Sequence, residues 1–275
     1  MDSAPNMVAR QAGWSPVTRS FSETTIPITL MNLFGSTRTV VRSRHALIAP
    51  DGHVPSQLPG WTGATAFVLI SPAMGAGVTQ MLIHFDLDEG KAVFPSSAHE
   101  HAFYILSGSG AVHLSSGKRD FQTGDYFFVP AGEAFHISAA AQTRLCLFRN
   151  VFVPHPEFPL PQILSGSSRD VVGTPFLGNP KALLQVLLPD EPRMDFAMNI
   201  FTYQAGATLP FVETHIMEHG LLMLEGQGVY RLEDSYYPVA AGDAIWMAPY
   251  CPQWFVAMGD SPASYLYCKN VNRLP

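Results

Sequence analysis

An internal repeat covers most of this chain and limits the folds that it can adopt. When His101 is placed on His219, at an offset of 118 residues, the turn residues of the two halves coincide without a gap. Gly108 meets Gly226, Gly110 meets Gly228, and Gly124-Asp125 meets Gly242-Asp243. Each half therefore has two apolar segments around a Gly-x-Gly turn and a third after a Gly-Asp turn. This pattern is typical of antiparallel strands joined by tight turns.

The third segments, residues 126–129 and 244–247, are rich in aromatic or bulky apolar residues and are followed by Pro130 and Pro249, which cannot continue a strand ladder. The 23 prolines and 22 glycines of the chain separate many short apolar segments and favour an all-β fold. We expect two antiparallel barrels. Along the chain we expect an N-terminal extension at 1–60, a first barrel at 61–152, a Pro- and Ser-rich linker at 153–170, and a second barrel at 171–275. Within the extension, a strand at 39–48 is expected to cover a barrel edge.

Composition excludes several classes of protein. Apolar residues make up 47% of the chain and charged residues 14%, so it can bury a large core and is not of the disordered class. The formal net charge of -6 and the lack of a basic run argue against a nucleic-acid partner. The longest mostly apolar stretch, residues 64–70, is far shorter than a membrane span, so we expect no membrane partner.

The cysteines and the start of the sequence bear on the cellular compartment. Cys146, Cys251 and Cys268 are odd in number and form no CxxC pair, which disfavours a disulfide framework. Residues 1–20 lack the apolar core of a secretory signal. We therefore expect a soluble protein of the reducing cytoplasm.

One short stretch of the second half has the ligand density of a metal site. Glu213 and His215 are two residues apart, so they share one face of an extended strand, and His219 has the same parity. Gln253, just after the third segment of the same half, is the candidate fourth ligand. Two imidazoles, a carboxylate and an amide oxygen suit Mn(II), Fe(II), Ni(II) or Zn(II), and the absence of thiolates argues against a structural zinc site.

The first half keeps the turns of the repeat but loses these ligands. Pro95, Ser97 and Phe135 stand where the second half has Glu213, His215 and Gln253, and of the four positions only His219 keeps a histidine counterpart, His101. We interpret His99 and His101 as hydrogen-bonded surface groups, because no carboxylate accompanies them. One barrel should then carry a site while the other is architectural.

These motifs resemble those of the cupin superfamily, and the two halves together resemble a bicupin, a pair of antiparallel jelly-roll β-barrels in one chain. The metal-binding positions of the first cupin motif hold Glu213, His215 and His219, followed after six residues by Gly226, and the second motif ends in Gln253 where a histidine is usual. This ligand set is similar to that of the (S)-ureidoglycine aminohydrolase family. Further similar runs are residues 47–55, 219–232, 242–249 and 269–273.

The resemblance implies a manganese enzyme of purine-ring (allantoin and allantoate) catabolism that hydrolytically deaminates (S)-ureidoglycine to (S)-ureidoglycolate and ammonia. Its metal ligands would be Glu213, His215, His219 and Gln253. Such a small substrate needs a cation for its carboxylate and hydrogen-bonding groups for its urea. Lys269, Tyr230 and Tyr265 are the candidates, with Glu213 as a carrier of protons. Tyr265, Tyr267 and Lys269 are spaced by two and share a strand face.

Other functions remain open at this point. Another metal-dependent cupin enzyme, a dioxygenase or an isomerase, would usually present more histidines than this set. A non-enzymatic bicupin that stores or binds sugars would generally lose the ligands in both halves, whereas here one half keeps four. Since the repeat keeps its packing residues in the half that has lost its ligands, we also expect the two barrels to dock closely and the protein to form a homo-oligomer.

Overall fold

The structure is a computed structural model that describes residues 37–273. It therefore leaves out the first part of the predicted extension at 1–60. The first half contains β3 to β12, which are Pro55–Ser56, Ala64–Ile70, Thr79–Phe85, Gly90–Phe94, His99–Ser107, Ser109–Leu114, Gly117–Gln122, Asp125–Val129, Phe135–Ala139 and Arg144–Val151. The second contains β14 to β22, which are Thr174–Phe176, Asn179–Val186, Phe196–Tyr203, His219–Glu225, Gln227–Leu232, Ser235–Ala240, Ala244–Met247, Gln253–Met258 and Ala263–Asn270.

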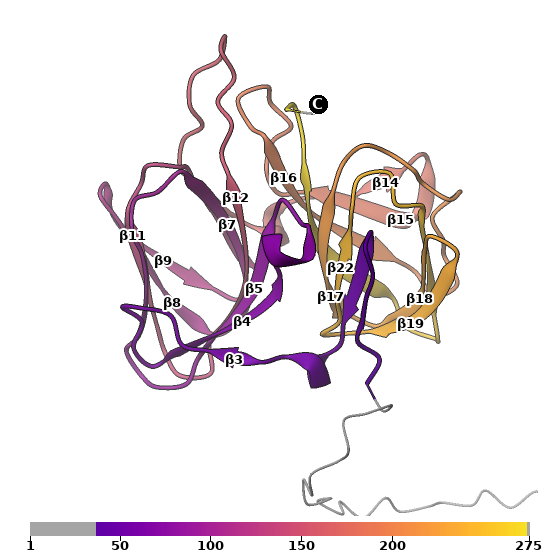
Figure 1. Ribbon diagram of the computed structural model, residues 1–275, viewed down its shortest axis with the longest axis horizontal. Helices are drawn as coiled ribbons and strands as arrows, with labels where there is room; N and C mark the ends of the chain where they lie inside the picture. The colour runs from indigo at the N-terminus through magenta and orange to yellow at the C-terminus, as the bar shows by residue number, and fades with distance from the viewer. Residues whose placement is uncertain (1–36, 274–275) are drawn as a thin grey trace, which may run out of the picture. The chain divides into compact units, whose positions relative to one another are not determined.

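Each half closes two antiparallel sheets around its own core, and Figure 1 shows the two barrels. The first barrel has the sheet order β13-β10-β7-β12-β5-β4-β3 over a smaller sheet β6-β11-β8-β9. The second has β1-β2-β20-β17-β22-β16-β15-β14 over β19-β18-β21. The predicted all-β fold with two antiparallel barrels is confirmed. The only helical segments described are three short 3-10 turns, Pro50–Gly52, Pro72–Met74 and Ser168–Asp170, and none is long and apolar enough to cross a membrane.

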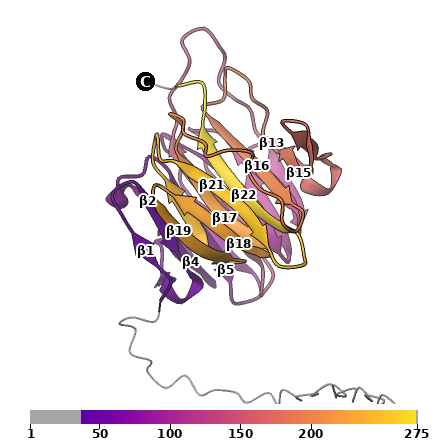
Figure 2. The same cartoon turned by 90° about the vertical axis from the view of Figure 1, so that its right-hand side faces the viewer.

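The two barrels exchange edge strands. β2, His45–Ile48, precedes the first barrel along the chain but pairs with β20 of the second. Figure 2 shows β2 beside the strands of the second barrel. β13, Leu164–Ser167, precedes the second barrel but pairs with β10 of the first. Each exchanged strand covers an edge that would otherwise expose unpaired backbone groups.

The exchange changes two expectations about strands. The strand expected at 39–48 does cover a barrel edge, but a turn divides it into β1, Val40–Val41, and β2. The segment 153–170 is not only a linker, because its last part forms β13. Its prolines all lie before residue 162, so only the part after them has the continuous N–H groups that a ladder needs.

The Gly-Asp turns of the repeat anchor the exchanged segments. The carboxylate of Asp243 is buried and accepts two bonds from the Arg38 guanidinium, at 2.5 and 2.8 Å. In the other half, Asp125 accepts a bond of 2.8 Å from Arg169, which follows β13. Each aspartate also accepts a backbone N–H of its own turn. The turn that repeats in the sequence therefore has the same structural use in both barrels.

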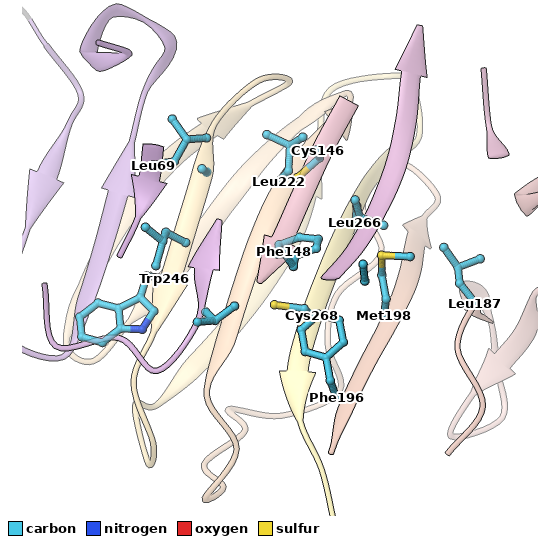
Figure 3. Close-up of a cluster of buried hydrophobic side chains, with 14 of the residues drawn as sticks. Leu69, Cys146, Phe148, Leu187, Phe196, Met198, Leu222, Trp246, Leu266 and Cys268 are labelled. Atoms are coloured by element: carbon cyan, nitrogen blue, oxygen red, sulfur yellow. The ribbon is translucent and has the colours of Figure 1, made fainter. Parts of the chain in front are cut away.

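Apolar side chains form one core inside each barrel and a third between the barrels. Alternate residues of β12 and β22 supply the third core, with Cys146 and Phe148 meeting Leu266 and Cys268 (Figure 3). All four are at most 1% exposed. Gln80 of β5 also donates a bond of 3.0 Å to the carbonyl of Leu221 in β17. The close docking expected of the two barrels is therefore present.

Two carboxyl groups meet at the interface between the barrels. Glu100 of β7 is 1% exposed, and neither of its oxygens has a hydrogen-bond partner of normal geometry among the described residues. It faces the carboxyl of Asp195, which accepts the N–H of Val153 at 2.7 Å. Burial and then Asp195 raise the pKa of Glu100 to about 10, and the distant positive charge of Arg273 opposes this only in part.

Glu100→Gln should stabilise the protein in a pH-dependent way. The folded chain holds the Glu100 proton up to about pH 10, whereas an unfolded chain releases it near the ordinary value of 4.5. Folding therefore takes up a proton between these values, and the free energy of unfolding falls as the pH rises. We expect the variant to be more stable by about 2 kcal/mol at pH 8 and to match the wild type at pH 4, in urea denaturation. A variant that is less stable at pH 8 would contradict the assignment.

Candidate metal and substrate site

The predicted metal ligands are positioned by β17, β21 and the segment that leads into β17. Glu213 and Gln253 lie opposite each other and exchange two backbone hydrogen bonds, at 2.8 and 2.9 Å. The carbonyl of His215 accepts the N–H of Tyr250 at 2.7 Å, which holds the intervening loop against the barrel. His219 begins β17 and pairs with Lys269 of β22. Backbone pairing thus brings together residues that are up to 56 positions apart, from 213 to 269.

A cavity of about 140 Å³ inside the second barrel gathers all of the predicted site residues. Its lining includes the four candidate ligands and the three candidate substrate groups. The complete lining is Phe176, Phe201, Leu209, Glu213, His215, Met217, His219, Tyr230, Gln253, Tyr265, Tyr267 and Lys269. Polar groups in a pocket with apolar walls are the usual form of a small-molecule site. Two larger cavities, each about 750 Å³, lie outside this barrel core and contain none of these residues.

The two imidazoles of the site are neutral and closely stacked. Their ring centroids are 4.8 Å apart, and the His219 ring is also parallel to Tyr267 at 5.4 Å. Burial, reinforced by the Lys269 charge, lowers the pKa of His215, and burial together with His215 and Lys269 lowers that of His219. His215 Nδ1 and His219 Nε2 are buried without hydrogen-bond partners among the described residues. A neutral imidazole with an uncommitted ring nitrogen is the form that binds a metal.

Gln253 links the ligands to the tyrosines. Its amide nitrogen lies 2.9 Å from His215 Nε2, and its amide oxygen accepts the Tyr230 hydroxyl at 3.4 Å. Gln253 itself is 2% exposed, so an amide there must find polar partners within the barrel. A metal ion would satisfy the amide oxygen more strongly than a hydroxyl does, so Gln253 stays a candidate ligand beside the two histidines.

The donor set of this cavity fits a divalent metal ion. The buried histidine nitrogens lack partners, and burial raises the pKa of the Glu213 carboxyl, while Lys269 lowers it. Within residues 37–273, no three His, Cys, Asp or Glu side chains are already gathered closely enough to hold an ion by themselves. A ligand shell therefore also needs the Gln253 amide and a change of side-chain rotamers when an ion binds. Nitrogen and oxygen donors without thiolate suit Mn(II) and similar ions.

The tyrosines of the cavity stay protonated and supply hydrogen-bond donors. Burial raises the pKa of Tyr230, and Glu213 raises it further. Burial likewise raises the pKa of Tyr265 well above its ordinary range. The Tyr265 hydroxyl lies 3.2 Å from that of Tyr203, which is fully buried behind it. Since Tyr265, Tyr267 and Lys269 alternate along β22, they share the face that points into the barrel.

Sequence reasoning missed several residues of this site. Tyr203 holds the Tyr265 hydroxyl from behind, and Phe176, Phe201 and Leu209 form the apolar wall. Tyr203 and Phe201 alternate along β16 beside β22, so their parity could have placed them on the inner face. The register between the two strands, which brings the hydroxyls together, is not visible in the sequence.

The equivalent position of the first barrel is packed with apolar side chains, and it corrects one expectation. His101 is not a hydrogen-bonded surface group. It is 4% exposed and packs edge-on against Phe94 and Phe135, at 5.4 and 5.2 Å. The parity of β7 directs its ring into the core, where Phe135 fills the space that Gln253 has in the second barrel. His99, half-buried, does have its expected hydrogen bond, to Ser97 Oγ at 3.3 Å.

Gln253→His should keep the metal and lower the activity. Imidazole is a stronger ligand than an amide oxygen for iron and nickel, so metal content should stay at about one ion per chain and shift towards those ions. The rate should fall by about ten- to a hundred-fold, the range seen when the surroundings of a bound metal change. Metal analysis and steady-state kinetics measure both effects. Gln253→Leu is the matched control, and if it keeps full metal and full rate, Gln253 is not a ligand.

Comparison with known proteins agrees with this geometry. The sequence profile of the cupin domain matches residues 83–151 and 199–268, one match in each barrel. The chain is 37% identical over 260 residues to a probable (S)-ureidoglycine aminohydrolase of Oryza sativa subsp. japonica, covering 94% of this chain and 82% of the relative. It is 32% identical to the (S)-ureidoglycine aminohydrolase of Arabidopsis thaliana, over 99% of this chain and 91% of the relative.

The chain belongs to the (S)-ureidoglycine aminohydrolase family. A solved structure has a similar fold. The crystal structure of the Escherichia coli protein Ylba superposes with a TM-score of 0.77 at 28% identity, covering 86% of this chain and 96% of that chain. The comparisons therefore cover both cupin barrels of the present chain.

Proposed function

We propose that the second barrel is the active site of a Mn(II)-dependent (S)-ureidoglycine aminohydrolase. The observation that carries the proposal is the single buried cavity that combines Glu213, His215, His219 and Gln253 with Lys269 and two protonated tyrosines. The products would be (S)-ureidoglycolate and ammonia, in the breakdown of the purine ring through allantoin and allantoate. The membership of the family and the chemistry of the cavity support the same reaction.

The proposed metal site uses four of the residues that line the cavity. Glu213, His215, His219 and Gln253 would hold the ion, and the ion when bound would act as a Lewis acid that orients the substrate and stabilises negative charge. Strand or bridge pairing fixes the backbone of Glu213, His219 and Gln253, and His215 lies in the loop between them. With the backbone fixed in this way, only the side chains would have to turn to surround an ion.

Lys269 would bind the substrate carboxylate, and the tyrosines would bind the ureido group. The ammonium of Lys269 lines the cavity and is the natural partner of a carboxylate. Tyr230 and Tyr265, which stay protonated, would donate to the ureido carbonyl. These contacts fix which face of the reacting carbon is open to water, and so the configuration of the product.

The reaction exchanges one bond to the central carbon for another. The C–N bond to the amine breaks and ammonia leaves, which gives an imine, and water then adds so that a C–O bond forms. Burial raises the pKa of the Glu213 carboxyl, and Lys269 lowers it in part; this carboxyl of the cavity is the candidate that takes and returns a proton. Its second role as a metal ligand makes it a weaker base than a free carboxylate. No oxidant or reductant is needed for the balance.

We further propose a cytoplasmic homo-oligomer. The thiols of Cys146, Cys251 and Cys268 are free and buried, which supports a reducing compartment. Exposed apolar side chains near the mouth of the second barrel, among them Phe211 at 56% and Tyr250 at 55%, support contact with another copy of the chain. Light scattering at micromolar concentration tests this assembly, and a monomer there would contradict it.

A coupled assay tests the proposed reaction. Manganese-loaded protein is added to allantoate and an allantoate amidohydrolase, which supplies the unstable substrate, and ammonia release and product configuration are followed. We expect faster ammonia release and (S)-ureidoglycolate, equally in air and under argon. A rate that needs oxygen, with oxygen uptake, would indicate a dioxygenase instead. No effect of the protein on ammonia release or on product configuration would overturn the proposal.

A further inference from the structure

The mouth of the first barrel has a cation at the place where the second barrel has Lys269. Arg149 of β12 pairs with His101 of β7, just as Lys269 of β22 pairs with His219 of β17. The residues two and four before Arg149, Leu147 and Leu145, belong to the core of the first barrel. The parity of the strand therefore directs the Arg149 side chain to the inner face, at the mouth.

The cation of the first barrel lacks the carboxylate that accompanies Lys269. In the second barrel the Lys269 charge acts on the carboxyl of Glu213. In the first barrel Pro95 replaces that residue, and Glu100, the nearest carboxyl along β7, points to the opposite face towards Asp195. Among residues 37–273, Arg149 forms no ion pair, and its buried Nε has no acceptor. A guanidinium stays charged at every relevant pH, so this group lacks a counter-ion.

The groups around Arg149 favour an anion of small size. Burial and then the Arg149 charge lower the pKa of His99 and of His101, the latter to about 3, so both rings are neutral near pH 7. His99 is half-buried, and its Nδ1 lies 3.3 Å from Ser97 Oγ, which leaves Nε2 for another partner. Phe94 and Phe135, with ring centroids stacked 4.5 Å apart, belong to the apolar core of this barrel and take up space on its inner side.

We infer that the mouth of the first barrel binds a small carboxylate anion through the Arg149 guanidinium, with the His99 imidazole as a second donor. The planar fork of arginine matches the two oxygens of a carboxylate, and its one charge matches a monoanion. The barrel without metal ligands is then a second binding site of the chain and not only architecture. This inference does not rest on the reaction proposed for the second barrel.

The test uses acetate as the probe and removes the lysine of the second barrel. Full-length Lys269→Met protein, loaded with manganese, is compared with the Lys269→Met/Arg149→Met double variant. Saturation transfer to the acetate methyl group and the Tm at rising acetate concentration measure binding. We expect a saturable response in the single variant. In the double variant the affinity for acetate should be weaker by at least about tenfold. Equal responses in the two variants, or an equal Tm rise with chloride at the same ionic strength, would overturn the inference.

A second substitution supplies the missing carboxylate and does not touch the arginine. Pro95→Glu, in the Lys269→Met background, places a carboxyl where the second barrel has Glu213. We expect it to compete with acetate, so that the saturation signal falls at least about fivefold, while the Tm without acetate rises or holds. If acetate binds this variant as well as it binds Lys269→Met alone, Arg149 is not the anion site.

Discussion

His219→Ala is expected to remove both the metal and the activity. His219 is 8% exposed, its Nε2 has no hydrogen-bond partner among the described residues, and it is one of only two imidazoles in the cavity. Losing one of four ligands opens the shell, so dialysed protein should retain almost no ion. A metal that stabilises charge by several kcal/mol then no longer contributes, and kcat/KM should fall by about 10³-fold or more.

His101→Ala is the matched control for this change. The histidine lies at the same register in the first barrel, packed edge-on against two phenylalanines. Truncation there should lower the Tm, because it leaves a cavity in the core, while metal content and kcat/KM stay close to those of the wild type. If His219→Ala keeps its ion, or if His101→Ala loses one, the assignment of the metal to the second barrel is wrong.

Lys269→Met is expected to lower kcat/KM without loss of metal or fold. The side chain is only half-buried and lies on the inner face of β22, next to Glu213 and the tyrosines. Removing its charge-assisted contact with a substrate carboxylate should cost on the order of 2–3 kcal/mol, a few tens- to hundred-fold in kcat/KM. Steady-state kinetics, metal analysis and the Tm are measured together.

Lys181→Met removes a lysine from the exposed part of β15 in the same barrel and serves as the control. It should leave the kinetics and the metal content unchanged. A structural role for Lys269 would show differently, as a lower Tm with nearly normal kcat/KM in the protein that remains folded. That result would remove Lys269 from the proposed site and leave the metal ligands unaffected.

The fold was predictable from sequence because the turn glycines repeat for a physical reason. Gly108 and Gly226 both have positive φ, 87° and 72°. A Cβ at these positions would lie 2.3 Å from Thr143 Oγ1 and 2.4 Å from the carbonyl oxygen of Pro262. Only glycine tolerates such a turn, so both halves keep it, and the alignment of the repeat follows from those fixed positions.

The strand exchange was less visible because it depends on pairing between distant segments. β13 looks like part of a linker in the sequence, since four prolines lie between residues 153 and 162 and three of its four residues are small, Ser165, Gly166 and Ser167. What makes it a strand is the free edge of β10, which no local pattern records. The same limit applied to the place of Tyr203 behind Tyr265 and to the burial of His101. Both depend on strand register and packing, which residue type alone does not reveal.

The candidate ligands were predictable because each is chemically distinctive and out of place in an apolar barrel. Glu213, His215, His219 and Gln253 are polar side chains close to strands that otherwise build a core. The structure places all four on one cavity, together with Lys269. Their counterparts in the first barrel, where proline and phenylalanine replace acid and amide, explain why only one of two similar barrels is proposed to hold a metal.

A titration of metal-stripped protein with Mn(II), followed by ammonia release in the coupled assay, tests the central claim most directly. The rate should rise linearly and reach its plateau at about one ion per chain, because the second barrel carries the four proposed nitrogen and oxygen ligands. A plateau at two ions per chain, or a full rate before any Mn(II) is added, would contradict a single metal-dependent site in the second barrel.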